Sequence, residues 1–209
     1  MKVTSLKSVW IPAAQPSKRL IVVLHGRGDS PAGFQWLPSA LGFTDVNYLL
    51  VQAPDRYYTG YSWYDVPPNQ GPGILRSRES LERLFEELEG QGYPSETTIL
   101  FGFSQGCLMT LEWGGRTLRS LAGFIGISGY CYDPVALKKD LSAVAKRSRW
   151  LITHGTLDAV LAYEVTRKHV EELKAAGLPL EFHTFVKEHT IDDRDELPLL
   201  RTWMKGAWS

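Results

Sequence analysis

Short apolar runs alternate with segments of helical periodicity along the chain, and this alternation restricts the fold more than any other feature of the sequence. Apolar runs predict buried strands at residues 20–24, 46–51, 97–101, 121–127, 150–153 and 181–186. Because the segments between them suit helical crossovers, most neighbouring strands are expected to run parallel. Residues 3–11 predict an additional antiparallel edge strand. We therefore expect a three-layer α/β fold, with a mostly parallel central sheet and helices on both faces.

Amphipathic helices are predicted between these strands. Apolar residues recur at i, i+3, i+4 and i+7 of one segment, the spacing of a single buried face: Leu81, Leu84, Phe85 and Leu88. Ser77 is the predicted N-cap of this helix.

Three further helices follow along the chain. We expect helices over residues 163–176 and 192–204, the second beginning as much as one turn later because Pro198 lies inside it. Asp133 is the predicted N-cap of a helix that starts at Pro134.

An aromatic segment at residues 55–73 has neither helical nor strand periodicity. Prolines and glycines flank its rings, which is typical of a binding loop, and Tyr61, Trp63 and Tyr64 are its candidate substrate-binding residues. A packed loop whose rings fill the edge of the core explains the composition equally well. Both interpretations stay open at the level of sequence.

Composition limits the domain count and the partners. The chain has 209 residues, 44% of them hydrophobic, so one domain spanning residues 1–209 is expected. Lys and Arg together number 23, as do Asp and Glu, and this balance provides no positive field to hold nucleic acid. We expect a small-molecule substrate and no nucleic-acid partner.

The cysteines and the apolar runs bear on the compartment. Cys107 and Cys131 form no CxxC pair, and basic residues interrupt the apolar residues near the start, so no secretory signal is predicted. We therefore expect a reducing, cytoplasmic setting. No apolar run approaches the ~18 residues of a membrane-spanning helix, so no integral membrane association is expected. The sequence leaves a homodimer open.

A candidate nucleophile, Ser104, follows the strand predicted at residues 97–101. The sequence Gly102-Phe-Ser104-Gln-Gly106 has the form G-x-S-x-G, in which a sharp strand-to-helix turn exposes the serine hydroxyl. Positions two before and two after the serine are crowded in such a turn, and glycine fits there. The pentapeptide also arises by chance in surface turns, so its place between strand and helix carries the prediction.

A serine nucleophile needs a base, usually a histidine. The candidates are His25, His154, His169, His183 and His189. His25 precedes the serine, and His154 belongs to a strand end. His169 lies in the middle of a predicted helix, and His183 points to a face of a strand. His189 follows the C-terminal end of the last strand, where a loop can reach the serine, and is the predicted base. The alternative is a histidine of a surface loop.

The predicted acid is Asp158. It follows the strand at residues 150–153 and a glycine turn, and it lies between serine and histidine in the chain. A plain turn residue is the alternative.

Backbone amides are expected to form an oxyanion hole. The Gln105 amide directly follows the nucleophile at a helix start, and the Arg27 amide lies in a glycine-rich loop after the strand at residues 20–24. The segment Gly26-Arg-Gly28 lacks the third glycine and the lysine of a phosphate-binding loop.

These motifs resemble the phospholipase/carboxylesterase family of α/β hydrolases, including its acyl-protein thioesterase branch. Segments 24–29, 62–65 and 102–106 are similar to its oxyanion segment, substrate-loop signature and nucleophile elbow, and segments 127–129 and 189–191 match as well. The resemblance implies an α/β-hydrolase fold without a large cap domain. It also implies a serine esterase, thioesterase or lysophospholipase that needs no cofactor.

The sequence also bears on two alternative functions and on a metal site. A dienelactone-type hydrolase has the same fold but usually a cysteine nucleophile, whereas here Cys107 follows Ser104 by three residues. A hydrolase-shaped protein that only binds a ligand is the second alternative. No H-E-x-x-H or similar set predicts a metal site. Within the esterase hypothesis, Trp63 is expected to border the acyl pocket.

Overall fold

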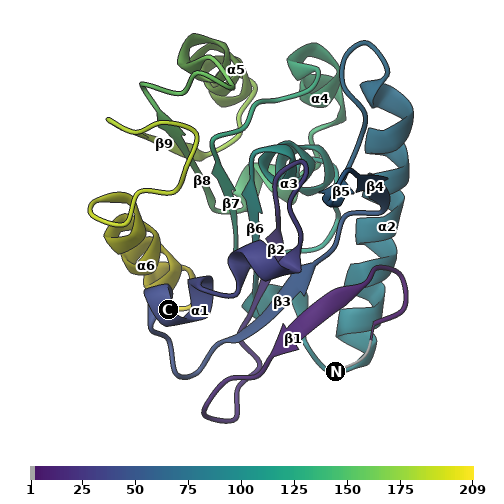
Figure 1. Cartoon of the computed structure of the whole chain (residues 1–209), viewed down its shortest axis with the longest axis vertical. Coiled ribbons are helices and arrows are strands. Elements are labelled where there is room, and N and C mark those ends of the chain that lie inside the picture. Colours follow the sequence, from purple (N-terminus) through teal and green to yellow (C-terminus); the bar gives the residue numbers. More distant parts are fainter. Residues whose placement is uncertain (1–2) are drawn as a thin grey trace.

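The computed structural model describes residues 3–209, whose centre is a seven-stranded sheet in the order β1-β3-β2-β6-β7-β8-β9 (Figure 1). β1 (Ser8–Ile11) pairs antiparallel with β3, and the remaining neighbours pair parallel. The parallel strands are β2 (Leu20–Leu24), β3 (Asn47–Val51), β6 (Thr98–Phe103), β7 (Gly123–Ile127), β8 (Trp150–Gly155) and β9 (Leu180–Phe185). The predicted parallel sheet and its antiparallel edge strand are confirmed.

Two hydrophobic cores lie on opposite faces of the sheet, because successive strand residues point to opposite sides. In β2, Leu20, Val22 and Leu24 belong to one core and Ile21 and Val23 to the other. The first core is covered by α2 (Gln70–Gly90), α3 (Gln105–Gly114), α4 (Pro134–Asp140) and α5 (Tyr163–Ala175). The second is covered by α1 (Leu37–Leu41) and α6 (Glu196–Ala207), which lie together in Figure 1. Short 3-10 turns occupy Pro31–Phe34, Ser95–Thr97 and Ala145–Arg147.

The start of α2 differs from the prediction. The helix begins at Gln70, so Ser77 is an interior residue and not the N-cap; its hydroxyl donates to the Trp63 carbonyl at 2.6 Å. Pro72 is tolerated because the first helical turn needs no amide donor there. Packing leaves no room for a side chain at Gly73, since a Cβ at this position would lie 2.8 Å from the Tyr64 Cα. The last residues of the predicted loop at 55–73 are thus helical.

The aromatic segment at residues 55–73 is more regular than expected. It contains a hairpin of β4 (Asp55–Tyr57) and β5 (Gly60–Ser62) and ends in the first turn of α2. The hairpin is joined to the loop after β2, because Gly28 donates to the Tyr61 carbonyl at 2.8 Å and Tyr61 donates to the Asp29 carbonyl at 2.9 Å. This segment is therefore attached to the loop that carries Arg27.

The other helix ends follow the sequence closely. Asp133 caps α4 by accepting from the Ala136 amide at 2.9 Å, as predicted. α6 begins at Glu196, one turn later than residue 192, which places Pro198 in its first turn. Among residues 3–209, no helix combines the length and apolar character needed to cross a membrane.

The strand order determines where a site can form. β2 has β3 on one side and β6 on the other, so the connections leaving the carboxyl ends of β2 and β6 diverge there. Such a switch point leaves a crevice at that edge of the sheet. Arg27 follows β2 and Ser104 follows β6, while the loops after β8 and β9 carry Asp158 and His189. All the predicted chemical groups therefore lie at one edge.

Candidate active site

Ser104 occupies the sharp turn between β6 and α3. Its φ of 55° and ψ of −114° fall outside the conformations usual for a residue with a side chain. The Ser104 amide donates to the Ile127 carbonyl at 2.8 Å, which attaches the turn to the neighbouring strand β7. Tertiary structure thus holds a strained serine at the start of a helix, as sites that must present a reactive group often do.

The two glycines of the pentapeptide are required by close backbone approach. A Cβ on Gly102 would lie 2.1 Å from the Gly106 carbonyl oxygen, and a Cβ on Gly106 would lie 2.1 Å from the Leu24 carbonyl oxygen. Neither contact can be relieved by moving a flexible side chain, because both involve backbone atoms. The G-x-S-x-G spacing therefore follows from packing of β2, β6 and α3 at the turn.

A continuous hydrogen-bonded chain joins the three predicted side chains. His189 Nε2 lies 2.9 Å from Ser104 Oγ, and His189 Nδ1 lies 2.7 Å from Asp158 Oδ2. The His189 side chain is 17% exposed, so the imidazole borders the surface while the carboxylate beneath it is fully covered. The Phe103 ring packs beside the imidazole, with 5.1 Å between ring centroids. The structure therefore brings together all three residues named from the sequence.

Asp158 is held as a carboxylate by its surroundings. Its Oδ1 accepts from the Val160 and Leu161 amides at 2.9 and 2.8 Å. Burial acts to raise the pKa of Asp158, but the hydrogen bonds from Leu161, His189 and Val160 and the nearby His189 charge outweigh it, so the pKa is lowered. An ionised Asp158 can accept the Nδ1–H of His189, which leaves Nε2 free to accept a proton from Ser104.

His154 lies beside this carboxylate without joining the chain to the serine. It is fully buried, and its Nε2 lies 2.9 Å from the Leu161 carbonyl oxygen and 3.4 Å from Asp158 Oδ2. Burial lowers the pKa of His154, so the ring is neutral. This placement agrees with its interpretation as a structural residue of the turn.

Two backbone amides next to Ser104 have no partner. Neither the Gln105 nor the Arg27 amide donates a hydrogen bond to another group of the described chain. The Gly26 carbonyl, which shares a planar peptide with the Arg27 amide, accepts from His25 Nδ1 at 2.7 Å and from the Asp29 amide at 3.3 Å. Because C=O and N–H point to opposite sides of a trans peptide, these bonds turn the Arg27 amide away from the loop.

His25 keeps that peptide in place. It is buried, its Nε2 accepts from the Ala53 amide at 3.1 Å, and its Nδ1 therefore carries the proton that Gly26 accepts. Burial lowers the pKa of His25, so the ring remains neutral. The sequence indicated the loop but not this function of its histidine.

The Gln105 side chain joins the nucleophile turn to the aromatic segment. Its Oε1 accepts from the Trp63 amide at 3.0 Å and from the Ser62 hydroxyl at 3.1 Å, and its Nε2 donates to the Tyr64 carbonyl at 2.9 Å. Trp63 is 0% exposed, and its Nε1 donates to the His25 carbonyl at 2.9 Å. Trp63 is therefore a buried support of the site.

A cavity of about 450 Å³ opens beside Ser104. The residues that line it come from the turn at Ser104, the aromatic segment, the start of α2 and the loops after β2, β7, β8 and β9: Arg27, Tyr64, Asp65, Val66, Pro67, Gln70, Ser104, Gln105, Tyr130, Val160, Leu161 and His189. Of the three aromatic residues named from the sequence, Tyr64 lines the cavity, whereas Trp63 and Tyr61 do not. Tyr61 instead packs against the core.

Sequence reasoning missed two polar residues of the cavity wall. Gln70 Nε2 donates to the Tyr130 hydroxyl at 2.6 Å. Tyr130 comes soon after β7, the strand beside β6, so the rule that ligands bind at the carboxyl ends of parallel strands could have indicated it. Gln70 lies in the segment at residues 55–73 that could bind substrate, but no pattern singled it out, because the predicted helix began after it.

A second cavity, of about 330 Å³, also borders His189. Its wall combines polar and apolar residues: Asp29, Gly33, Phe34, Trp36, Phe103, His189, Thr190 and Ile191. The imidazole thus lines two cavities, each with both polar and apolar groups in its wall. A two-part substrate has room in both.

Cys107 has the environment of a core residue. It is completely buried, and its Sγ would lie 2.5 Å from a Cβ placed on Gly126. Burial raises the pKa of the Cys107 thiol to about 12, so it is not a thiolate near neutral pH. Among the residues that the structure describes, no three histidine, cysteine or acidic side chains gather in a way that could hold a metal ion.

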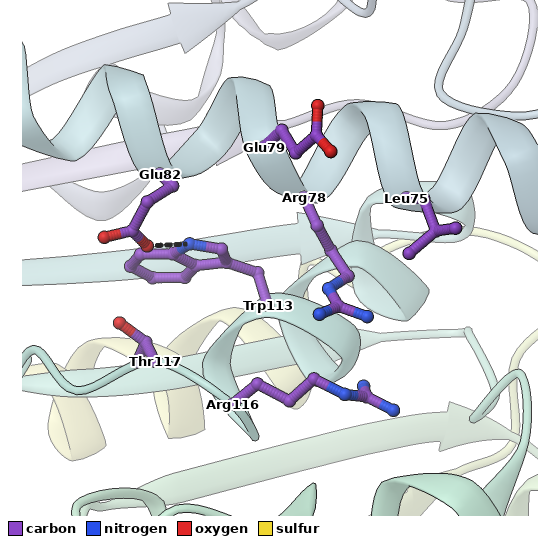
Figure 2. Close-up of a pocket in the computed structure, with 7 residues that line it drawn as sticks. All are labelled: Leu75, Arg78, Glu79, Glu82, Trp113, Arg116 and Thr117. Atoms are coloured by element: carbon purple, nitrogen blue, oxygen red, sulfur yellow. Dashed lines mark hydrogen bonds between the residues drawn. The ribbon is translucent and has the colours of Figure 1, made fainter.

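Another cavity lies between α2 and α3, remote from Ser104 (Figure 2). Arg78 and Arg116 extend into it, and Glu82 accepts from the Trp113 indole at 2.9 Å. Arg116 lies beyond the C-terminal end of α3, whose ten residues span about 15 Å from the nucleophile turn. This region provides a site for control substitutions.

Known proteins share this sequence and fold. A family model described as Phospholipase/Carboxylesterase matches residues 7–204. Acyl-protein thioesterase 1 of Schizosaccharomyces pombe is 32% identical over 171 residues, which cover 75% of each chain. Acyl-protein thioesterase 1 of Yarrowia lipolytica is 30% identical over 174 residues, covering 75% of this chain and 77% of that protein.

Solved structures of other proteins have the same fold as this chain. The crystal structure of esterase PE8 is 26% identical, with a TM-score of 0.82 and coverage of 98% of this chain and 100% of that one. SOBER1 of Arabidopsis thaliana shares the fold with a TM-score of 0.84 at 24% identity, covering 93% of this chain and 100% of that one. The chain belongs to the phospholipase/carboxylesterase family of α/β hydrolases and is a hydrolase of esters or thioesters.

Proposed function

We propose that Ser104, His189 and Asp158 are the nucleophile, the general base and the orienting acid of a hydrolase that forms an acyl-enzyme. One observation carries the proposal: a hydrogen-bonded chain with distances of 2.7 and 2.9 Å ends at a serine hydroxyl beside two unpaired amides. An acyl transfer needs both parts, a base to remove the serine proton and donors for the negative oxygen that forms.

In the first step, Ser104 Oγ attacks the acyl carbonyl carbon while its proton passes to His189 Nε2. The carbonyl oxygen becomes an oxyanion, which the Arg27 and Gln105 amides stabilise. Asp158 stabilises the imidazolium and keeps its orientation. When the carbon–oxygen or carbon–sulfur bond to the leaving group breaks, the alcohol or thiol takes the proton from His189, and the acyl group stays on Ser104.

In the second step, water replaces the leaving group. His189 Nε2 accepts a proton from water, whose oxygen attacks the acyl-enzyme carbonyl. The same amides hold the second oxyanion, and Ser104 recovers its proton from His189 when the acid leaves. The cycle consumes one water and needs no group beyond the chain.

Polar groups in part of the larger cavity's wall support a substrate half that is short or carries a polar group. Gln70 and Tyr64 are buried at this wall, and the Tyr130 hydroxyl there accepts from Gln70. A long alkyl chain against these groups would remove water from them without replacing its hydrogen bonds, which costs free energy. The cavity beside Phe34 and Trp36 has room for the other half.

We further propose that the protein acts as one domain in the cytoplasm on a small-molecule substrate. The balanced charge and two free, buried cysteines support this setting.

A panel of p-nitrophenyl esters from two to sixteen carbons, with acyl thioesters alongside, tests the proposed function. The wild type is expected to hydrolyse several members, and Ser104→Ala is expected to lose both turnover and covalent labelling by a fluorophosphonate. Undiminished labelling of the folded variant would contradict the assignment of Ser104 as the nucleophile. Binding of these compounds without turnover by the wild type would favour a protein that only holds a ligand.

A further inference from the structure

The segment that carries His189 lacks regular secondary structure. It connects β9 to α6 across residues 186–195, and only a short turn interrupts it. A catalytic base needs a fixed position to within about 0.5 Å, and a loop provides this only when other groups hold it.

Lys187, two residues before His189, ties the loop to itself. Its side chain is only 3% exposed. The ammonium donates to the Thr190 carbonyl at 2.7 Å and to the two carboxylate oxygens of Glu196 at 2.7 and 2.6 Å. Each of its three hydrogens therefore has an acceptor. Because Lys187 and Thr190 flank His189, one side chain joins both sides of the segment that carries the imidazole.

Glu196 anchors the other end. It is the first residue of α6, and its side chain is 0% exposed. Besides the bonds from Lys187, its Oε1 accepts from the Thr153 hydroxyl on β8 and its Oε2 accepts from the Asp192 amide at 2.9 Å. Each oxygen thus accepts two hydrogen bonds, which fills the capacity of a carboxylate. The loop is thereby attached to the sheet and to α6.

The backbone of Lys187 also contacts the loop that carries Asp158. Its carbonyl accepts from the Leu157 amide at 3.1 Å. A Cβ on Gly155 would lie 2.2 Å from the same carbonyl oxygen, so the two loops touch closely at this point. Lys187 therefore lies where the supports of His189 and Asp158 meet.

From these contacts we propose that Lys187 and Glu196 are positioning residues, which hold His189 in line with Ser104 and Asp158. The inference rests on the proposed function, because it assigns a role relative to that triad. A buried ion pair is a weak source of stability, since the cost of desolvating two charges offsets their attraction. Its fully bonded arrangement around His189 instead fixes a conformation, and a displacement of about 1 Å at a reacting group can cost about 100-fold in rate.

The test replaces both charges by apolar side chains of similar size. Lys187→Met/Glu196→Leu removes the anchors without leaving a single buried charge, and kcat for p-nitrophenyl acetate is expected to fall 10-fold to 100-fold while KM stays within twofold. Lys187→Gln/Glu196→Gln keeps groups that hydrogen-bond to each other and to the loop. Its kcat is expected to fall only threefold to tenfold, a partial rescue that a purely structural role does not produce.

A matched control uses the ion pair of Glu112 and Arg116, 2.7 Å apart with side chains 3% and 14% exposed. Arg116 lines the remote cavity of Figure 2. Arg116→Met/Glu112→Leu is expected to lower the melting temperature and leave kcat within twofold. All assays are run where circular dichroism shows each variant folded. If the apolar variant does not fold, the kcat of the glutamine variant tests the positioning role.

The outcomes separate the two proposals. Wild-type kcat in the folded apolar variant, or in the glutamine variant if the apolar one is unfolded, would overturn the positioning role alone. An equal loss of kcat in the control pair would also overturn it, because the effect would then follow stability. An inactive wild type would overturn the proposed function and this inference with it.

Discussion

Asp158→Asn tests the orientation of the imidazole that we propose as the base, His189, with little change in shape. In the wild type, Oδ1 accepts from two amides, those of Val160 and Leu161, and Oδ2 accepts from His189. An asparagine has one oxygen and one NH₂ group, so it cannot accept both from the two amides and from His189. The structure determines which of these hydrogen bonds is kept.

The two amides decide the orientation of the new side chain. If the NH₂ group faced Val160 and Leu161, two hydrogen bonds worth about 1 kcal/mol each would be lost. The opposite orientation is therefore favoured by about 2 kcal/mol, a population ratio of roughly 30. The NH₂ group then donates to His189 Nδ1, the imidazole proton moves to Nε2, and Nε2 no longer accepts from Ser104. The wrong tautomer alone is expected to lower kcat by about 30-fold, and because the neutral amide also no longer stabilises the imidazolium, the total loss is expected to approach about 10⁴-fold.

The assay is kcat for p-nitrophenyl acetate near pH 7.5, with circular dichroism to verify folding. Asp158→Ala is the comparison, because it removes the acceptor without imposing a tautomer, and it is expected to lose no more activity than Asp158→Asn. A kcat for Asp158→Asn within tenfold of the wild type would refute the reasoning.

Further predictions concern stability and specificity. Gly102→Ala places a Cβ against the Gly106 carbonyl, so the free energy of unfolding should fall by about 1–3 kcal/mol in thermal or urea denaturation; an unchanged value would contradict the packing argument. His25 and His154 are neutral in the folded state because burial lowers their pKa below the unfolded value. Stability is therefore complete above about pH 6.5 and should fall below it by up to about 1.4 kcal/mol per pH unit for each ring, as urea denaturation across pH 5–8 would show; a constant value would count against neutral rings. Tyr130→Phe removes a polar group from the cavity wall, so kcat/KM for octanoyl relative to acetyl esters should rise about threefold to tenfold, and an unchanged ratio would exclude this wall from specificity.

Local patterns predicted the centre of the sheet because its parallel strands are buried on both faces, whereas the edge strand β9 is only partly buried. Residues 20–24 form an uninterrupted apolar run, and the observed strand has the same bounds. The G-x-S-x-G motif was informative for a similar reason, since its glycines record backbone contacts that few sequences meet. The order of Ser104, Asp158 and His189 then followed from the requirement that each lie after a parallel strand.

Features that depend on contacts between distant segments were not accessible. Glycine and proline at residues 71–73 indicated a loop, but the structure shows Gly73 fitting against Tyr64 inside a helix. The rings of the aromatic segment gave no sign that Tyr64 would line the cavity while Trp63 was buried. No local pattern singled out Lys187 or Glu196, because nothing in the sequence shows that these two charges meet in the interior.

Rapid mixing with p-nitrophenyl acetate tests the central claim most directly. The account predicts a burst of one equivalent of p-nitrophenol per chain before steady turnover, together with one acetyl group on the peptide that contains Ser104 after acid quenching. A linear time course with no acetylated protein, or an acetyl group on another residue that accounts for turnover, would contradict the assignment of the nucleophile.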